Sequence, residues 1–350
     1  MKAKKNILVA PLNWGIGHAT RCIPIINQLI KNDFNVVIAS SGRSLQLLVE
    51  EFPKNDFIKT SDYQIKYNNL FPLWISILMQ TPKLFFKIKN EKKELEKIIN
   101  DFNIDAVISD SRFGFYSEKI TSIFITHQLE IQSRFFKSLI NKINYFFINK
   151  FNECWVLDYK NNGLAGQLSH PKKIVKYVKY IGPQSRLKKK KLQKKYDIIA
   201  IVSGPEPQRS IFEKILIKEL KKSEKKSIIV QGKPEIKSKT KIKNLTIISH
   251  LKSSEINEVI LQSELVICRS GYSTIMDLHK LSKNAILVPT PGQTEQEYLA
   301  NYLSKNNIFK SQNQNTFSLD LAIKQSNNFE QAFAKNDKFN WEKLFKIFEI

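Results

Sequence analysis

The chain has 350 residues, 42% of them hydrophobic, and a formal net charge of +24. That length exceeds one ordinary hydrophobic core and predicts two domains. The three widely spaced cysteines, Cys22, Cys154 and Cys268, argue against a disulfide framework or a Cys-type zinc site and suit a reducing, cytoplasmic environment. No stretch approaches the roughly 20 apolar residues that span a bilayer, and the apolar run after the basic start is too short for a signal peptide.

The positive charge leaves two interpretations open. It could attract an anionic partner, such as nucleic acid or an acidic membrane face, or it could consist of lysines spread over solvated faces. The densest cluster, residues 186–195, lies between two organised regions and is typical of a solvated linker. No zinc-finger, RNP or KH pattern is present, so nucleic acid is not the favoured partner.

The first half alternates strand and helix patterns. Continuous apolar runs predict strands, and apolar residues at helical spacing predict the helices between them. The expected strands are residues 6–11, 35–40, 105–110, 122–127 and 153–158, and the expected helices are residues 19–31, 43–52, 82–102 and 135–151. This alternation predicts a doubly wound parallel sheet with helices on both faces.

The same pattern restarts at residue 196. The expected strands are residues 196–204, 227–232, 245–250, 264–271 and 284–291, and the expected helices are residues 209–222, 254–262, 273–281 and 295–305. The predicted organisation is an N-terminal Rossmann-like domain (1–182), a basic linker (183–195), a second Rossmann-like domain (196–330) and a helical tail (331–350) that could pack back on the first domain. Two such domains are expected to face a cleft at the carboxyl ends of their strands.

A Gly-x-Gly turn follows the first expected strand, at residues 13–18. Its glycines allow a tight turn, and the helix start behind it can attract an anion. A dinucleotide fingerprint would need a third glycine and an acidic residue at the end of the second strand, where this chain has Thr20 and Ser40. NAD or FAD is therefore not expected here, and a purely structural turn stays possible.

Three loops of the second half also run from a strand into a helix. Gly204 and Arg209 flank the first loop, which lacks the Gly-Lys-Ser/Thr of a P-loop. The other two contain Arg269, Ser270, Gly271, Ser273, Thr274 and Asp277, and Gln293, Gln296 and Glu297. Backbone N–H groups, hydroxyls, amides and carboxylates at helix starts suit phosphates and sugar hydroxyls, so together these loops predict a nucleotide-sugar site.

At these loops the sequence resembles a GT-B glycosyltransferase, and most of all glycosyltransferase family 28, which includes the GlcNAc transferase that completes lipid II. The resemblance is carried by residues 264–278 (ELVICRSGYSTIMDL), 288–303 (VPTPGQTEQEYLANYL) and 14–21 (WGIGHATR). It implies a two-domain GT-B fold and a nucleoside-diphosphate sugar donor, expected to be UDP-linked. The acceptor would be a hydroxyl of a lipid-linked or cell-envelope glycan.

The resemblance also implies roles for single residues. Gly271, Ser273 and Thr274 would hold the donor diphosphate, and Asp277 would hold the ribose where the family usually has Glu. Gln296 and Glu297 would contact the donor sugar, where the lipid II enzyme has two glutamines, so the sugar itself stays open. The remaining implied donor-side residues are Gly204, Arg209, His250, Leu251, Arg269, Ser270 and Gln293, and the acceptor-side loop comprises Trp14, Gly15, Gly17 and His127.

Two side chains are candidates for the general base that an inverting transfer requires. His18 has an ordinary pKa near 6.5, which suits the task, and the resemblance places a histidine of the family at the reaction centre. Asp110, at the end of an expected strand, could be the base or could orient His18. No Asp-x-Asp motif is present, so we expect no metal and no cofactor, with helix starts stabilising the leaving diphosphate.

Residues 70–79, together with the basic and aromatic segments 82–93 and 135–151, suggest peripheral binding to the anionic inner face of the plasma membrane. The alternative is that these aromatic residues are core and the lysines are solvated. Two other functions stay open: a sugar-nucleotide 2-epimerase of the same architecture, and a non-catalytic protein that binds an anionic glycan or nucleic acid.

Overall fold

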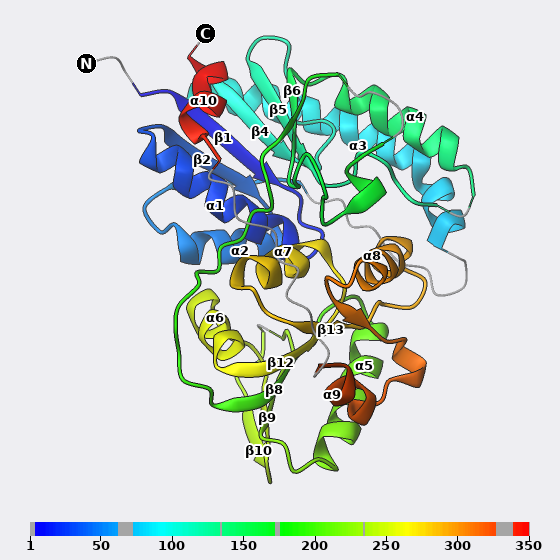
Figure 1. The fold of residues 1–350 in the computed structure, drawn as a ribbon. Helices are drawn as coiled ribbons and strands as arrows, with labels where there is room; N and C mark the ends of the chain where they lie inside the picture. Colours follow the sequence, from blue (N-terminus) through cyan, green and yellow to red (C-terminus); the bar gives the residue numbers. More distant parts are fainter. Residues whose placement is uncertain are drawn as a thin grey trace. The chain divides into compact units, whose positions relative to one another are not determined.

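The computed structural model describes residues 4–61, 73–133, 135–171, 176–233, 235–326 and 339–349. The chain divides into two compact units, Met1–Gln184 with Asp337–Ile350, and Ser185–Asn336. Each unit contains a seven-stranded sheet with helices packed against it (Figure 1). The predicted fold class, two Rossmann-like doubly wound domains, is confirmed.

The sheet of the first unit is parallel throughout, in the order β3-β2-β1-β4-β5-β6-β7. Its strands are β1 (Asn6–Pro11), β2 (Asn35–Ser40), β3 (Asp56–Lys59), β4 (Ala106–Asp110), β5 (Thr121–Thr126), β6 (Glu153–Val156) and β7 (Val178–Tyr180). Its helices are α1 (Gly17–Lys31), α2 (Gly42–Glu51), α3 (Leu73–Phe102), α4 (Lys137–Ile148) and α10 (Trp341–Phe345), with short 3-10 turns at Gly166–Leu168 and Lys346–Phe348.

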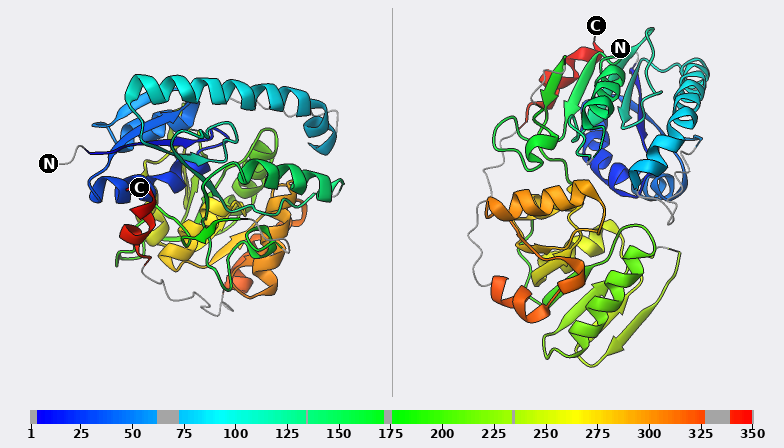
Figure 2. Two further views of the ribbon diagram at one scale, coloured as in Figure 1. Left: turned by 90° about the horizontal axis from the view of Figure 1, so that it is seen from above. Right: turned by 90° about the vertical axis from the view of Figure 1, so that its right-hand side faces the viewer.

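The helices of the first unit cover opposite faces of its sheet, because successive strand residues point to opposite sides. On one face Leu8, Ala10 and Val107 pack against Leu95 and Ile98 of α3. α10 lies on the other face (Figure 2).

The C-terminal residues of the chain are part of the core of the first unit. The ring centroids of Phe345 and Trp155 are 6.2 Å apart, and Phe34 lies 5.7 Å from Phe345 and 5.9 Å from Phe348. These ring contacts join residues that are distant in the sequence, so the first unit is assembled from residues 1–184 and residues 337–350.

The sheet of the second unit has the order β10-β11-β9-β8-β12-β13-β14, parallel except for the β10–β11 hairpin. Its strands are β8 (Tyr196–Ile201), β9 (Ser227–Val230), β10 (Lys239–Ile242), β11 (Leu245–Ile248), β12 (Ser263–Cys268), β13 (Ala285–Leu287) and β14 (Lys310–Ser311). Its helices are α5 (Gln208–Lys221), α6 (Ser253–Leu261), α7 (Tyr272–Leu281), α8 (Thr294–Lys305) and α9 (Leu319–Ser326), with a 3-10 turn at Gln314–Thr316.

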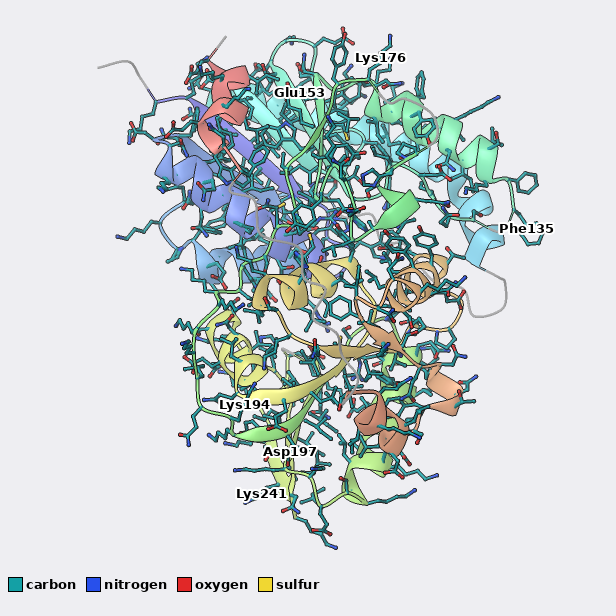
Figure 3. All side chains as sticks on the ribbon, in the orientation of Figure 1. Phe135, Glu153, Lys176, Lys194, Asp197 and Lys241 are labelled. Atoms are coloured by element: carbon teal, nitrogen blue, oxygen red, sulfur yellow. The ribbon has the colours of Figure 1, made fainter. Side chains whose placement is uncertain are left out.

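The basic segment 186–195 is packed along the second unit. Leu187 is buried, and the Lys188 backbone N–H and carbonyl both bond the side chain of Asn257, at 3.0 and 3.1 Å. Figure 3 places Lys194 beside β12. Most of its side chains are exposed, as in a solvated linker, while an apolar and an amide contact fix its backbone to the unit that follows.

Candidate active site

The loops that follow β1, β4 and β5 carry the candidate catalytic side chains of the first unit. These three strands are neighbours in the sheet, so their carboxyl ends meet at one edge. β1 lies between β2 and β4, which is the point where strand order reverses and where open α/β sheets bind ligands. His18 lies in the first turn of α1, Asp110 ends β4, and His127 follows β5 directly.

Asp110 is held by a bidentate ion pair with Arg21. Arg21 Nε donates to Asp110 Oδ2 at 2.7 Å, and Arg21 Nη2 donates to Oδ1. Both side chains are buried, with Asp110 fully inaccessible. Ser111 Oγ donates a further hydrogen bond to Oδ1, at 3.1 Å. These contacts hold the carboxylate in its charged form. Because it is buried, it cannot reach the hydroxyl of an acceptor substrate.

Arg21 also connects the two histidines of the site. Its Nη2 lies 2.8 Å from His18 Nδ1, and its Nη1 lies 3.0 Å from His127 Nδ1. His18 Nδ1 is in turn 3.0 Å from Asp110 Oδ1. The bond to Asp110 requires a proton on Nδ1 and leaves Nε2 as an acceptor, whereas the bond from Arg21 requires the opposite tautomer.

The same contacts set the protonation states. Burial lowers the pKa of His18 below its ordinary value, and repulsion by Arg21 lowers it further, against the opposing effect of Asp110. Burial opposes the ionisation of Asp110, but the charge of Arg21 and the hydrogen bonds to Arg21 and His18 outweigh it and hold the pKa of that carboxyl well below its usual range. At neutral pH the site therefore contains a neutral imidazole and a carboxylate, so His18 is the better of the two candidate bases.

The Gly-x-Gly turn forms the outer rim of this cluster. Gly15 has a φ of +74°, in the left-handed region that favours glycine, and Gly17 opens α1. The side chain of Trp14 is 51% exposed. A large exposed aromatic ring beside a reactive edge suits the apolar face of a ligand.

In the second unit, the loops after β8, β12 and β13 lie side by side, because these strands are also neighbours. Arg269 joins all three. Its Nη1 donates to the carbonyls of Val288 and Pro289, both at 3.2 Å, and its Nη2 donates to the carbonyl of Gln208 at 2.9 Å and to Gln314 Oε1 at 2.6 Å. The guanidinium also stacks over a phenylalanine ring.

Arg269 and Ser270 were expected to contact the sugar donor. Their contacts show instead that they support the loops of the site. Arg269 is 1% exposed, and burial lowers its pKa to about 10. Ser270 is fully buried and donates its hydroxyl to the carbonyl of Gln296 at 2.8 Å. Neither side chain is placed to contact a ligand, but both fix the loops that surround the start of α7.

Gly271, Ser273 and Thr274 lie half-buried at the start of α7. Gly271 is the N-cap residue of that helix, and a Cβ added there would meet no atom within 4 Å. The first turn of a helix points N–H groups and a positive dipole end toward such a space. Asp277, one turn further on, accepts a 2.5 Å hydrogen bond from Ser185 Oγ, and burial raises its pKa to about 6.

Arg209 is not presented as a phosphate ligand. Its Nε donates to Glu206 Oε1 and its Nη1 to Glu213 Oε2, both at 2.6 Å, and its Nη2 donates to Ser210 Oγ at 2.8 Å. Two carboxylates thus occupy a guanidinium that the sequence interpretation assigned to a diphosphate. Gly204, with a φ of +109°, keeps its predicted place in the turn before α5.

The amide and carboxylate side chains before and within α8 bind their own loop. Gln296 Oε1 accepts from the Thr290 N–H at 2.9 Å, and Glu297 Oε1 accepts from the Gly292 N–H at 2.8 Å. Gln296 Nε2 donates to Gln293 Oε1 at 2.5 Å. These contacts shape the turn and leave each side chain half-buried at its surface.

His250 and Leu251 follow β11, which β9 separates from β8. Both residues are half-buried. They belong to the carboxyl edge of the sheet but not to the three adjacent loops that Arg269 joins.

Within the described ranges, no three His, Cys, Asp or Glu side chains gather as ligands for a metal ion.

Comparison with known proteins agrees with this architecture. Residues 198–347 match the glycosyltransferase family 28 C-terminal domain, and residues 5–134 match glycosyl transferase family 1. The chain is a GT-B glycosyltransferase similar to family 28.

The transferase is similar along its whole length to a curated protein of Buchnera aphidicola subsp. Schizaphis graminum. The two are 26% identical, over 99% of this chain and 92% of the relative. That relative is named UDP-N-acetylglucosamine--N-acetylmuramyl-(pentapeptide) pyrophosphoryl-undecaprenol N-acetylglucosamine transferase.

Solved structures share the fold. Acinetobacter baumannii MurG has a TM-score of 0.53 at 12% identity, covering 94% of this chain and 92% of its own. A glycotransferase of kitacinnamycin has a TM-score of 0.64 at 11% identity, covering 93% and 91%. The comparisons support neither the epimerase nor the non-catalytic binding protein.

Arg21 belongs to the candidate site, but the sequence interpretation gave it no role. It stands three positions after His18, so the two side chains share one face of α1. That spacing was a usable signal, but an arginine in an amphipathic helix pattern looks like a solvated residue. Only the pairing of β1 with β4 brings it onto Asp110.

Proposed function

We propose that the transferase moves a sugar, a hexose or an N-acetylhexosamine, from a UDP-sugar to a hydroxyl of a lipid-linked acceptor, with inversion at the anomeric carbon. The observation that carries this proposal is the His18–Asp110–Arg21 cluster at the carboxyl edge of the first sheet. The named activity of the Buchnera relative supports the choice of UDP and of a lipid-linked acceptor.

His18 would accept the proton of the acceptor hydroxyl. This role requires the tautomer with its proton on Nδ1, donated to Asp110 Oδ1 at 3.0 Å, because Nε2 is then the free acceptor. Asp110 and Arg21 would be positioning residues. The oxygen of the acceptor attacks the anomeric carbon as the bond to the diphosphate breaks, and UDP leaves with both electrons of that bond.

The second unit would stabilise the leaving diphosphate. Its negative charge grows in the transition state, and N–H groups at the start of α7 are already oriented to receive it. Ser273 and Thr274 would add hydroxyl donors, and Asp277 would accept from a ribose hydroxyl. We propose that these groups suffice without a metal ion or a cofactor.

Substitution of Gly271 by valine tests the donor side. The open space at Gly271 should tolerate the added carbons, and a poorer N-cap costs about 1 kcal/mol or less of the free energy of unfolding. Affinity for UDP, measured by calorimetry, should fall about tenfold or more, since the carbons would occupy the approach to the N–H groups.

Lys280→Val is the matched control, because Lys280 is exposed on the last turn of the same helix. It should leave UDP affinity unchanged. Equal affinities for all three proteins would remove the start of α7 from the donor site. If the unmodified protein neither binds UDP nor releases UDP from any UDP-sugar with a lipid-linked acceptor, the proposed function is wrong.

An exposed aromatic surface on the first unit supports a membrane-associated acceptor. Phe85 and Phe147 bring α3 and α4 into contact, with ring centroids 5.8 Å apart. The aromatic surface consists of Phe85, Phe86, Phe135, Phe136, Leu139 and Phe146, all of them exposed. Figure 3 shows Phe135 projecting outward beyond these helices.

The same two helices also carry exposed lysines, Lys89 and Lys142, which suits binding to an anionic bilayer face. None of the described helices combines the length and the apolar character needed to cross a membrane. Of the segment 70–79, residues 70–72 lie outside the described residues, and the rest form the start of α3, whose side chains there are not described. We therefore propose peripheral binding through residues 85–86 and 135–146.

Flotation with vesicles containing phosphatidylglycerol tests this surface. The unmodified protein should float at low salt, and the triple variant Phe135→Ser, Phe136→Ser, Phe146→Ser should lose most of its bound fraction. Each exposed aromatic ring contributes apolar area that membrane burial rewards. Substitution of Ile211 by serine, an exposed apolar residue of the second unit, is the control and should float normally. Unchanged flotation of the triple variant would assign binding to charge alone.

A further inference from the structure

A concave surface lies at the end of the second sheet where β12 begins, opposite the donor loops. It has a volume of about 510 Å³, and its lining includes Lys190, Lys191, Lys194, Lys283 and Glu264. Its floor is the end of α6 and the start of β12, whereas the donor loop leaves the other end of β12. We call this surface the lysine pocket, and the proposed transfer reaction makes no use of it.

Two ammonium groups of the lysine pocket share the same two acceptors. Lys283 Nζ donates to the carbonyls of Leu261 and Ser263, at 3.2 and 2.5 Å. Lys194 Nζ donates to the same carbonyls, at 3.1 and 2.8 Å. The two charges are therefore near neighbours. Lys283 is only 8% exposed, so water screens its charge poorly.

The charge of this pair is only partly compensated by the protein, through the nearby carboxylate of Glu264. Each ammonium has three N–H donors, and the two carbonyls account for two of them. Among the residues with described side chains, neither Lys194 nor Lys283 has a carboxylate within ion-pair distance, although Glu264 also lines the pocket. Burial, then the hydrogen bond to Lys194 and the charge of Lys194, lower the pKa of Lys283 to about 7, and the charge of Glu264 opposes them. An anion in the pocket would relieve the repulsion.

We propose that the lysine pocket binds a small tetrahedral oxyanion, such as phosphate or the phosphate group of a phosphomonoester, between Lys283 and Lys194. Charge-assisted hydrogen bonds from two adjacent ammonium groups suit two oxygens of one such anion. Lys190 and Lys191 add positive charge at the rim.

The lysine pocket is connected to the donor loop through two elements. β12 runs from Ser263 at the pocket to Cys268, just before Gly271. α7 runs back from Tyr272 to Leu281, and Lys283 follows it closely. An anion in the pocket would thus bind at the far ends of the two elements that carry the donor loop.

Titration of the full-length protein with sulfate at constant ionic strength and pH 6, where Lys283 is charged, tests the proposal, with binding followed by calorimetry. Lys283→Met and Lys194→Met should each weaken sulfate binding about tenfold or more, the loss expected when one charge-assisted hydrogen bond is removed. Lys280→Met removes the same charge from an exposed position of α7 and should bind sulfate as the unmodified protein does.

Lys194→Met keeps the test decisive if Lys283→Met fails to fold, because Lys194 is an exposed residue. If both pocket variants bind sulfate as the Lys280→Met control does, or if no protein binds it, the two lysines only cap the end of α6 and the proposal is wrong. Vesicles containing phosphatidic acid, whose headgroup is a phosphomonoester, distinguish the source of the anion. Loss of flotation in Lys194→Met points to a lipid headgroup, and unchanged flotation with weakened sulfate binding points to a free anion.

Discussion

His18→Gln should lower kcat of the transferase by about 100- to 10,000-fold, the contribution typical of a general base. Glutamine is polar and of similar reach, but it cannot accept the acceptor proton at neutral pH. Because the side chain of His18 is 15% exposed, the variant should fold. The measurement is UDP release from a UDP-sugar in the presence of acceptor.

The control for His18→Gln is its own donor binding and stability. The proposed donor residues belong to the second unit, so the affinity for UDP should be unchanged, and the unfolding midpoint should stay close to that of the unmodified protein. A variant with full turnover would remove His18 as the base. A variant that loses UDP binding as well would show instead that His18 contributes to the donor site.

The pH profile gives a second measurement on the same residue. Burial and Arg21 lower the pKa of His18 below 6.5, so the imidazole is already neutral at pH 7. The activity should therefore hold as pH falls to about 6.5 and decline only below it, as the imidazole gains a proton. A decline that begins above pH 7 would contradict the lowered pKa.

Arg21→Met should destabilise the protein by about 3–5 kcal/mol, the typical cost of leaving one member of a buried ion pair without its partner. Asp110 is fully buried and receives two hydrogen bonds from Arg21. Denaturant unfolding monitored by circular dichroism measures this loss. Arg43→Met, an exposed arginine on the adjacent α2, should change the free energy of unfolding by no more than about 0.5 kcal/mol.

A double variant separates the unpaired charge from other effects of losing Arg21. Arg21→Met combined with Asp110→Asn removes both charges, so it should be more stable than Arg21→Met alone.

The single variant Arg21→Met should also move the acid limb of the activity profile to higher pH. Arg21 repels the imidazolium form of His18, and without that repulsion the pKa of His18 rises. A limb that stays in place would mean that burial alone sets this pKa.

The sequence predicted the central strands and left the edge strands unassigned. β1 and β4 are continuous apolar runs buried on both faces, and they dominate the pattern. β3 and β14 are short and half-exposed, so their composition does not differ from that of a loop. α3 begins at Leu73, ahead of the predicted start at 82, because Pro82 looked like a first helical residue but lies inside the helix.

The candidate site was predictable where backbone position decides it. His18 and Asp110 were expected to lie near one edge of the sheet because each follows or ends a buried strand, and the structure brings them within 3.0 Å of each other. Charge partners were harder to assign. Arg209 was interpreted as a ligand although Glu206 and Glu213 stand three and four positions away, the spacing at which helix side chains pair. The partners of Arg269 come from three separate loops, which no local pattern predicts.

The core contacts of Phe345 and Phe348 have a consequence for synthesis. Both rings are 2% exposed and pack against Phe34 and Trp155, so the second unit is an insertion within a discontinuous domain. Residues 339–349 are translated after the whole inserted unit. The second unit can therefore fold while the chain is still attached to the ribosome. The first unit begins earlier but can complete its aromatic core only after residues 339–349 have been synthesised.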